Sequence, residues 1–181
     1  MREMKTFLLV DDHSVLYRPG TERVVTPLQR HEASPVIVGQ DKPWEVAVAW
    51  TSVYRDPVTG FTQMWYQAYT GDGMPERTQD CVTCYAESDD GIVFRKPELD
   101  LFPFGEIKRT NIVMIGNGGY SYRYGNFVVV DPEPADEQKR YKMAYFDFGG
   151  TDGKEDPGLF VAFSPDGIHW TKHRSGPVSL M

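Results

Sequence analysis

Short runs of β-branched and aromatic residues, each ended by a polar turn, recur along this chain. Residues 61–69 are apolar on both faces for part of their length, which is typical of a central strand covered on both sides. Together with its neighbours, this run predicts a four-stranded, up-and-down antiparallel sheet. The expected strands are residues 50–54, 61–69, 82–87 and 92–94.

The second half of the chain repeats this pattern in a degenerate form. The turn residues Asp56 and Asp131 lie 75 positions apart (131 − 56), and Gly91 and Gly167 lie 76 positions apart (167 − 91). Two landmarks that agree on one period indicate an internal repeat. The strands expected in the copy are residues 126–130, 140–145 and 159–163, followed by a turn at 164–170.

The repeat predicts how the whole chain is organised. Antiparallel meanders with a period of tens of residues are typical of a β-propeller, and no stretch shows convincing helical periodicity, so the expected class is all-β. Propellers close with about four to eight blades. Two blades are therefore expected to belong to a longer protein, or to be completed by a second chain or a homo-oligomer. The boundaries are 1–49 for N-terminal strands and lead-in, 50–97 for blade repeat one, 98–124 for the connection, and 125–181 for blade repeat two and the exit.

Charge and apolar content narrow the possible partners. The net charge of −7 and pI near 5.1 argue against nucleic acid or an anionic membrane as a partner, since both need clustered Lys and Arg. No apolar run approaches the ~18 residues of a membrane span. The patch at residues 7–10 is too short for a secretory signal, which favours the cytoplasm. Cys81 and Cys84 form a lone C-x-x-C inside a predicted strand, and we interpret them as reduced cysteines.

Several short motifs together resemble five-bladed β-propeller proteins related to glycoside hydrolase families 32 and 43. They are LVDDH at 9–13, DKPWE at 41–45, SVYRDP at 52–57, MWY at 64–66, YAESDDGI at 85–92, RYKMAY at 140–145 and SPDGIHW at 164–170. The resemblance covers nearly the whole chain but only the N-terminal portion of the family's fold. It implies that a sugar binds in a central funnel lined by the innermost strand of each blade. It implies no required cofactor. A funnel calcium ion is suggested by the resemblance alone, and no residue set in the sequence indicates a metal site.

Hydrolysis of a glycosidic bond typically uses two carboxyl groups, one as an acid with a raised pKa and one as a nucleophile or base. The predicted catalytic residues are Glu45 and Asp12. Glu45 lies just ahead of the inner strand of blade one, although a surface turn would also explain it. Asp12 belongs to a polar interruption of an apolar strand, where polar groups are costly unless they are paired or face a cavity. A capped turn is the alternative for Asp12.

Five residues are predicted to bind the sugar: Trp44, His13, Tyr122, Arg123 and Asn126. Trp44 could stack on a sugar face or pack on a neighbouring blade. Arg123 could hold a carboxylate, a sulfate or a sugar hydroxyl, or form an ion pair between blades. Asp56 matches an Arg-Asp-Pro motif of family 32, but Asp-Pro opens a turn in both repeats, so we interpret Asp56 as a turn residue.

The predicted function is cleavage of a glycosidic bond in an unidentified glycan by paired carboxylates. The alternative is a propeller that binds carbohydrate without cleaving it, or one subunit of a ring completed by another chain. An enzyme needs two funnel carboxylates within about 5–10 Å of each other. A binding protein needs aromatic rings and hydrogen-bond donors but no such pair.

Overall fold

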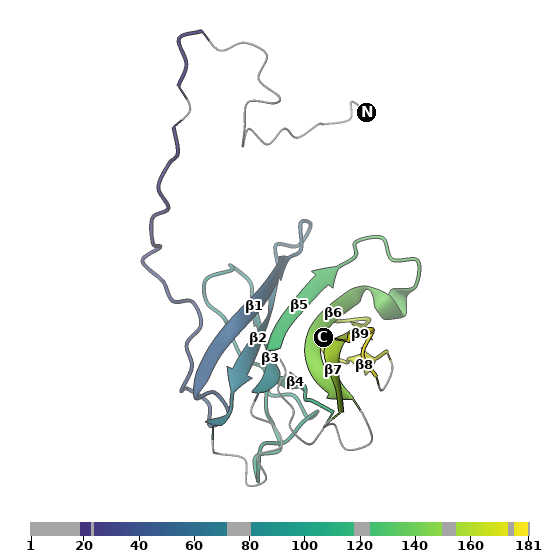
Figure 1. Cartoon of the computed structure of the whole chain (residues 1–181). Helices are drawn as coiled ribbons and strands as arrows, with labels where there is room; N and C mark the ends of the chain where they lie inside the picture. Colours follow the sequence, from purple (N-terminus) through teal and green to yellow (C-terminus); the bar gives the residue numbers. More distant parts are fainter. Residues whose placement is uncertain are drawn as a thin grey trace. The chain divides into compact units, whose positions relative to one another are not determined.

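The computed structural model describes residues 19–22, 24–71, 81–117, 124–149, 155–173 and 176–180. The chain divides into two compact units, residues 1–32 and 33–181. In the first unit, the described residues form no strand, and the strands predicted within residues 7–17 lie outside the described part. All the described strands belong to the second unit, and they form the two antiparallel sheets of an all-β fold, as predicted (Figure 1). In the described residues, no helix has the length and apolar character needed to cross a membrane.

The first sheet, sheet one, is a four-stranded meander in the order β1-β2-β3-β4. Every residue of β2 except its last is buried, as expected for a strand covered on both faces. Asp56 closes the β1–β2 turn, where its carboxylate accepts hydrogen bonds from two backbone amides of that turn. The strands are β1 (Ala47–Arg55), β2 (Thr62–Tyr69), β3 (Cys81–Ser88) and β4 (Ile112–Met114).

The second sheet, sheet two, repeats this arrangement with the order β5-β6-β7-β8, and a further short strand, β9, also pairs with β7. A 3₁₀ turn, η2 (Glu137–Lys139), lies between β5 and β6. The outer edge of β7 is thus shared by two short strands. The strands are β5 (Tyr124–Val130), β6 (Tyr141–Gly149), β7 (Glu155–Ser164), β8 (Thr171–Lys172) and β9 (Ser179–Leu180).

The fourth strand of sheet one is not where the sequence pattern predicted it. Residues 92–94 form no strand, and β4, which lies within the predicted connection at 98–124, pairs with β3 instead. The physical reason lies in the turn, because the Asp90 carboxylate accepts hydrogen bonds from the amides of Ile92 and Val93 at 2.8 Å each. Amides held in this way cannot join a ladder. Asp90 also lacks the positive φ that a two-residue type I′ hairpin turn between residues 87 and 92 would require.

The turns that follow β3 and β7 confirm the repeat at the level of individual hydrogen bonds. In the second turn, Ser164 Oγ accepts from the Gly167 amide at 2.9 Å, and Asp166 accepts from the amides of Ile168 and His169 at 2.8 Å. Ser88 and Asp90 make the same contacts in the first turn. Gly91 and Gly167 have nearly equal φ values, 78° and 80°. The two turns are therefore copies of one structure.

The two sheets pack face to face in a head-to-tail sense. Trp65 of β2 donates a 2.6 Å hydrogen bond from Nε1 to the Gly167 carbonyl, and its ring contacts the ring of Tyr141 in β6. Tyr141 pairs with Ser164 as Thr62 pairs with Ser88, so β6 residues 141 and 143 are the counterparts of β2 residues 62 and 64. The face of sheet two that packs against sheet one carries Tyr141 and Met143. It is therefore the counterpart of the face of sheet one that points away from sheet two.

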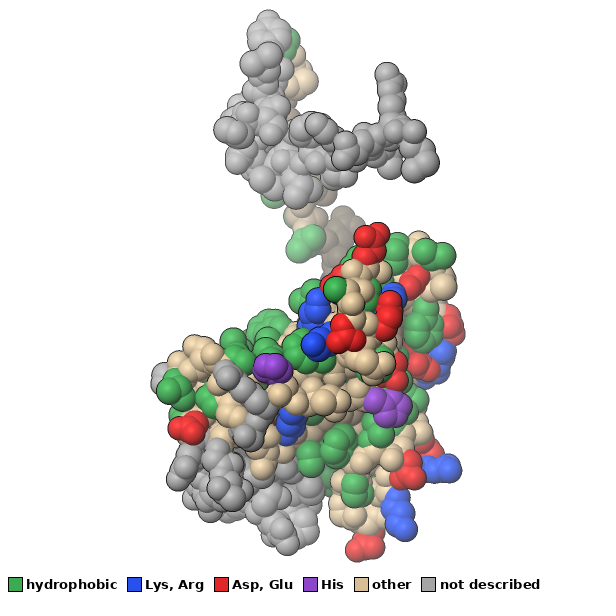
Figure 2. All heavy atoms as spheres, turned by 90° about the vertical axis from the view of Figure 1, so that its right-hand side faces the viewer, with side chains coloured by type: hydrophobic (Ala, Val, Ile, Leu, Met, Phe, Trp, Pro, Cys, Tyr) green, Lys and Arg blue, Asp and Glu red, His purple; other side chains and the backbone are tan. Residues whose placement is uncertain are grey.

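That face of sheet one, which carries Met64 and Tyr66, is covered by Trp44 and Phe104 from segments outside the sheet. By contrast, the far face of sheet two remains open. Phe127 and Val129 of β5 are 61% and 64% exposed there, while their neighbours Val128 and Val130 pack toward sheet one. Figure 2, which looks onto the side of β6 to β9, shows hydrophobic side chains at the surface between charged ones.

Candidate functional site

The first strands of the two sheets, β1 and β5, lie side by side (Figure 1). Each is the edge strand of its own sheet. The Ser52 hydroxyl joins them, because it donates to the Asn126 carbonyl at 3.0 Å and accepts from the Val128 amide at 3.1 Å. We call β1 and β5 the inner strands, and the surface that they border is the candidate functional site.

Both inner strands contain a β-bulge at the same point of the repeat. Between Ala49 and Ser52, β1 advances by three residues while its partner β2 advances by two. Between Tyr124 and Phe127, β5 likewise advances by three residues while β6 advances by two. Bulges of the G1 type have one residue in the left-handed conformation, a position normally taken by glycine. In β5 this residue is Gly125, with φ of 66°.

In β1 the left-handed residue is Trp50, with φ of 49°. Trp50 and Gly125 are counterparts, 75 positions apart (125 − 50), the same period as the turn residues. A side chain in this conformation costs about 1–2 kcal/mol. The indole is 52% exposed, and its Nε1 donates to the Tyr69 hydroxyl at 3.3 Å. Trp50 is the most open of the four tryptophans, since Trp44 and Trp65 are buried and Trp170 is half-buried.

Polar side chains fill the space between the sheets next to the inner strands. Gln67 accepts from the Gly125 amide at 3.2 Å, and Thr83 donates its hydroxyl to Asn126 Oδ1 at 3.0 Å. Asn126 is 1% exposed, and its Nδ2 has no hydrogen-bond partner among the described residues. An unsatisfied buried donor costs about 1–3 kcal/mol. This amide is therefore an unsatisfied donor that is buried between the sheets, behind the surface that the inner strands border.

The structure places Glu45 and Trp44 together, but in a closed network behind sheet one. The Glu45 carboxylate is fully buried and accepts from Lys96 Nζ at 2.5 Å and from the Tyr66 hydroxyl at 2.6 Å. Trp44 is 3% exposed and donates from Nε1 to Asn111 at 2.8 Å. Both residues lie against the face of sheet one that points away from sheet two. The Trp44 ring therefore offers no free face for a sugar.

The electrostatic surroundings of the Glu45 carboxyl group agree in part with a role as a general acid. Burial raises the pKa of the Glu45 carboxyl, and the nearby Asp41 carboxyl raises it further, while Lys96 and Tyr66 act in the opposite direction. A raised pKa is what a general acid requires. However, a substrate would have to displace Lys96 or Tyr66 to reach the carboxyl group. The described contacts favour a structural ion pair, and the catalytic role of Glu45 stays a prediction.

The other predicted site residues divide into two groups. Asn126 lies in β5, buried between the sheets, and is not brought together with Trp44 and Glu45, which lie on the opposite side of sheet one. Asp12, His13, Tyr122 and Arg123 lie outside the described residues. Sequence reasoning missed Trp50, although aligning the two repeats places this bulky residue opposite a glycine. That mismatch was the available signal.

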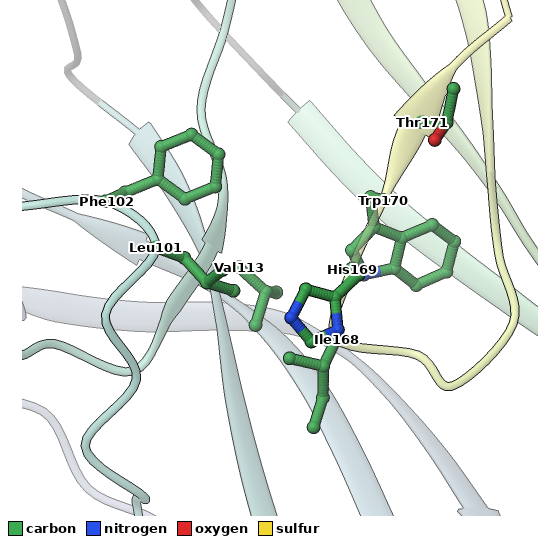
Figure 3. Close-up of a pocket in the computed structure, with 7 residues that line it drawn as sticks. All are labelled: Leu101, Phe102, Val113, Ile168, His169, Trp170 and Thr171. Atoms are coloured by element: carbon green, nitrogen blue, oxygen red, sulfur yellow. The ribbon is translucent and has the colours of Figure 1, made fainter.

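A small pocket and the distribution of metal-binding side chains also bear on where a ligand could bind. A pocket of about 180 Å³ lies between the turn after β7 and the segment before β4, lined largely by apolar side chains including Leu101, Phe102 and Trp170 (Figure 3). Ligand sites usually measure about 300–1,000 Å³, so this pocket is small for an oligosaccharide. Within the described ranges, no group of three or more His, Cys, Asp or Glu residues is arranged to hold a metal ion.

With the fold defined as two stacked antiparallel repeats, comparisons show one similar solved structure. It is the crystal structure of a protein from Parabacteroides distasonis ATCC 8503, described as a "putative glycoside hydrolase". The TM-score is 0.52 and the sequence identity 19%, over 83% of this chain and 41% of the other. This chain thus spans about two fifths of that protein's length, and at this identity the likeness shows a shared fold. No protein-family model matches the chain, and no curated protein matches its sequence.

Proposed function

We propose that the chain contributes two blades to a five-bladed, propeller-type glycoside hydrolase-like protein that acts on a glycan held against the inner strands. The observation that carries this proposal is the head-to-tail packing of two repeated sheets with β1 and β5 side by side. Repetition of this packing generates a radial array whose inner strands line one common surface. The shared fold with the Parabacteroides protein supports the same conclusion.

The open face of sheet two supports the expectation that further blades complete the protein. Phe127, Val129 and Leu159 are each more than 40% exposed there, and exposed apolar side chains gathered on one sheet face are typical of a surface that binds a partner, although Lys142 lies beside Val129. A further sheet, presenting the equivalent of the Tyr141 and Met143 face, would cover it in the same way that sheet two meets sheet one. Another part of a longer chain or a second chain would supply that sheet.

Catalysis would require two carboxyl groups at the glycosidic bond. The sequences of β1 and β5 contain no Asp or Glu, so these groups come from segments outside the inner strands. Glu45 and Asp12 remain the proposed pair, with His13, Tyr122, Arg123 and Asn126 as proposed sugar contacts. Sugar hydrolysis of this kind needs no cofactor, and a calcium ion stays a suggestion of the family resemblance.

A second candidate function, carbohydrate binding without cleavage, is favoured by two observations. The inner strands carry an exposed tryptophan and a buried, unsatisfied amide donor, and their sequences contain no carboxylate. The Glu45 carboxyl group is already paired with Lys96. A non-catalytic site of this kind needs aromatic rings and donors only.

The test begins with the native mass of the purified protein, measured by light scattering after size exclusion. A stable monomer of 20.6 kDa would refute the open two-blade interpretation. The assembly is then incubated with a panel of oligosaccharides, and new reducing ends and binding are measured. Cleavage supports the enzyme, and binding without cleavage supports the second function.

The site assignment is tested with Glu45→Gln, which keeps the side-chain volume, and Asp12→Ala. Glu98→Ala is the control, because Glu98 is an exposed acid paired loosely with Arg109 at 3.7 Å. If both site variants cleave as fast as the control, the proposed catalytic pair is wrong.

A further inference from the structure

We propose that Trp50 is a stacking platform for a pyranose ring, and that it sets the affinity of the inner strands for an oligosaccharide. The inference deepens the proposed function and rests on it. Three observations carry it: the backbone strain at Trp50, the exposure of its indole, and the free amide of Asn126 on the neighbouring inner strand.

The strain shows that the fold itself does not need this tryptophan. The bulge in β5 adopts the same conformation with Gly125 and no strain. A tryptophan in that position is unfavourable for the backbone, and half of its side chain stays in solvent, so packing recovers only part of the cost. Strained residues of this kind are concentrated at functional sites.

The position of the indole suits a planar ligand. The Tyr69 hydroxyl accepts the hydrogen bond from Nε1, which restrains the ring without burying it. A rigid, half-exposed aromatic ring offers a large apolar face next to a polar tip. Pyranose rings combine an apolar face of C–H groups with a rim of hydroxyls, so they match this surface better than a purely apolar or purely charged ligand.

The neighbouring strand supplies the hydrogen-bonding chemistry. The Asn126 carbonyl bonds the hydroxyl of Ser52, two residues after Trp50, so the free Nδ2 of Asn126 belongs to the same pair of strands. This Nδ2 is buried, so a ligand hydroxyl would reach it through a water molecule or by entering between the sheets. The exposed aromatic platform and an unsatisfied donor on the adjacent strand are together the elements of a neutral sugar subsite.

The experiment uses the full protein and a panel of hexasaccharides: cellohexaose, mannohexaose, xylohexaose and laminarihexaose. Affinity is measured by calorimetry for the wild type, Trp50→Gly and Trp50→Phe, with Val53→Ala as an exposed control on the same strand. Urea unfolding is measured for each variant. Iodide quenching of tryptophan fluorescence is measured with and without the bound hexasaccharide.

We expect Trp50→Gly to bind about tenfold or more weakly, since aromatic contacts of this size are typically worth that much. Its unfolding midpoint should equal or exceed that of the wild type, because glycine removes the strain. Trp50→Phe should bind within about threefold of the wild type because it keeps an aromatic face. The bound sugar should protect the wild type from iodide.

Three results would overturn the inference. Unchanged affinity in Trp50→Gly would refute the platform while leaving the proposed function intact. A lower unfolding midpoint in Trp50→Gly would show that the tryptophan serves the fold. Failure of the wild type to bind any of the four hexasaccharides would refute the proposed function together with the inference.

Discussion

The two copies of the turn after β3 and β7 provide a matched pair of mutations. Gly91 and Gly167 share the same left-handed conformation and the same hydrogen bonds. An alanine Cβ at position 91 would lie 3.5 Å from the Thr62 hydroxyl, an ordinary contact. At position 167 it would lie 2.5 Å from Cζ2 of Trp65 and 3.1 Å from the Tyr141 ring. The two substitutions therefore differ only in whether they push the sheets apart.

The magnitudes follow from these contacts. Alanine in the left-handed region costs about 1–2 kcal/mol at either position. Overpacking a well-filled interface costs a further 1–3 kcal/mol or so. Gly91→Ala is expected to lower the free energy of unfolding by about 1–2 kcal/mol, and Gly167→Ala by about 2–5 kcal/mol. The difference between the variants measures the packing of the turn against Trp65.

Urea unfolding, followed by circular dichroism, gives both values if the slopes agree with that of the wild type. Trp65→Phe removes the obstructing atom, so Gly167→Ala should cost about 1 kcal/mol less in that background. The Gly167 carbonyl would still accept a hydrogen bond from Trp170 at 3.0 Å. Equal destabilisation by the two alanine variants, with no rescue by Trp65→Phe, would refute the described contact between the sheets.

Two further predictions concern charged groups. Lys96→Met should lower the free energy of unfolding by about 3–5 kcal/mol, because it leaves the fully buried Glu45 without its cation, whereas Lys142→Met, which breaks an exposed pair with Asp131, should cost at most about 1 kcal/mol. Equal losses in urea unfolding would contradict the closed network. Burial alone would raise the pKa of Asp166, but hydrogen bonds from the His169 and Ile168 amides, the His169 ring and the Ser164 hydroxyl outweigh it and lower the pKa to about 2. A lowered pKa means that the ionised group stabilises the fold above its usual pKa of 3.8, and that this stabilisation is lost as the pH falls toward 2. Asp166→Asn does not titrate, so the stability gap between wild type and variant should shrink from pH 5 to pH 2, and a constant gap would contradict the assignment.

Local sequence signals predicted the strands and turns well where the stabilising contacts join residues that are close in the sequence. The apolar run of β2, the Asp56 turn and the Ser-x-Asp-Gly turn all depend on contacts within a few residues. The pairing of β4 with β3 could not be read in the same way, because its three residues join a strand that ended 24 positions earlier (112 − 88). Loop closure over that distance leaves no local pattern.

The candidate site shows the same limit. The position of Glu45 ahead of an inner strand was visible in the sequence, but its ion pair with Lys96, 51 residues later, was not. Burial of a carboxyl group depends on which distant cation reaches it. For Trp50 the signal was present in the sequence, because the aligned repeats place it opposite Gly125. The backbone conformation was needed to show that this tryptophan occupies a left-handed position that favours glycine.

The head-to-tail packing of the sheets also bears on how the protein avoids uncontrolled association. A heterologous contact that can repeat at both ends produces rings or open filaments. In the described part of this chain, Trp44 and Phe104 cover the face of sheet one that points away from sheet two. The far face of sheet two has no such cover among the described residues. A further sheet of the proposed ring can therefore pack directly only on sheet two, and closure of the ring against sheet one would run through the segments that carry Trp44 and Phe104, so copies of the unit cannot stack into a fibre.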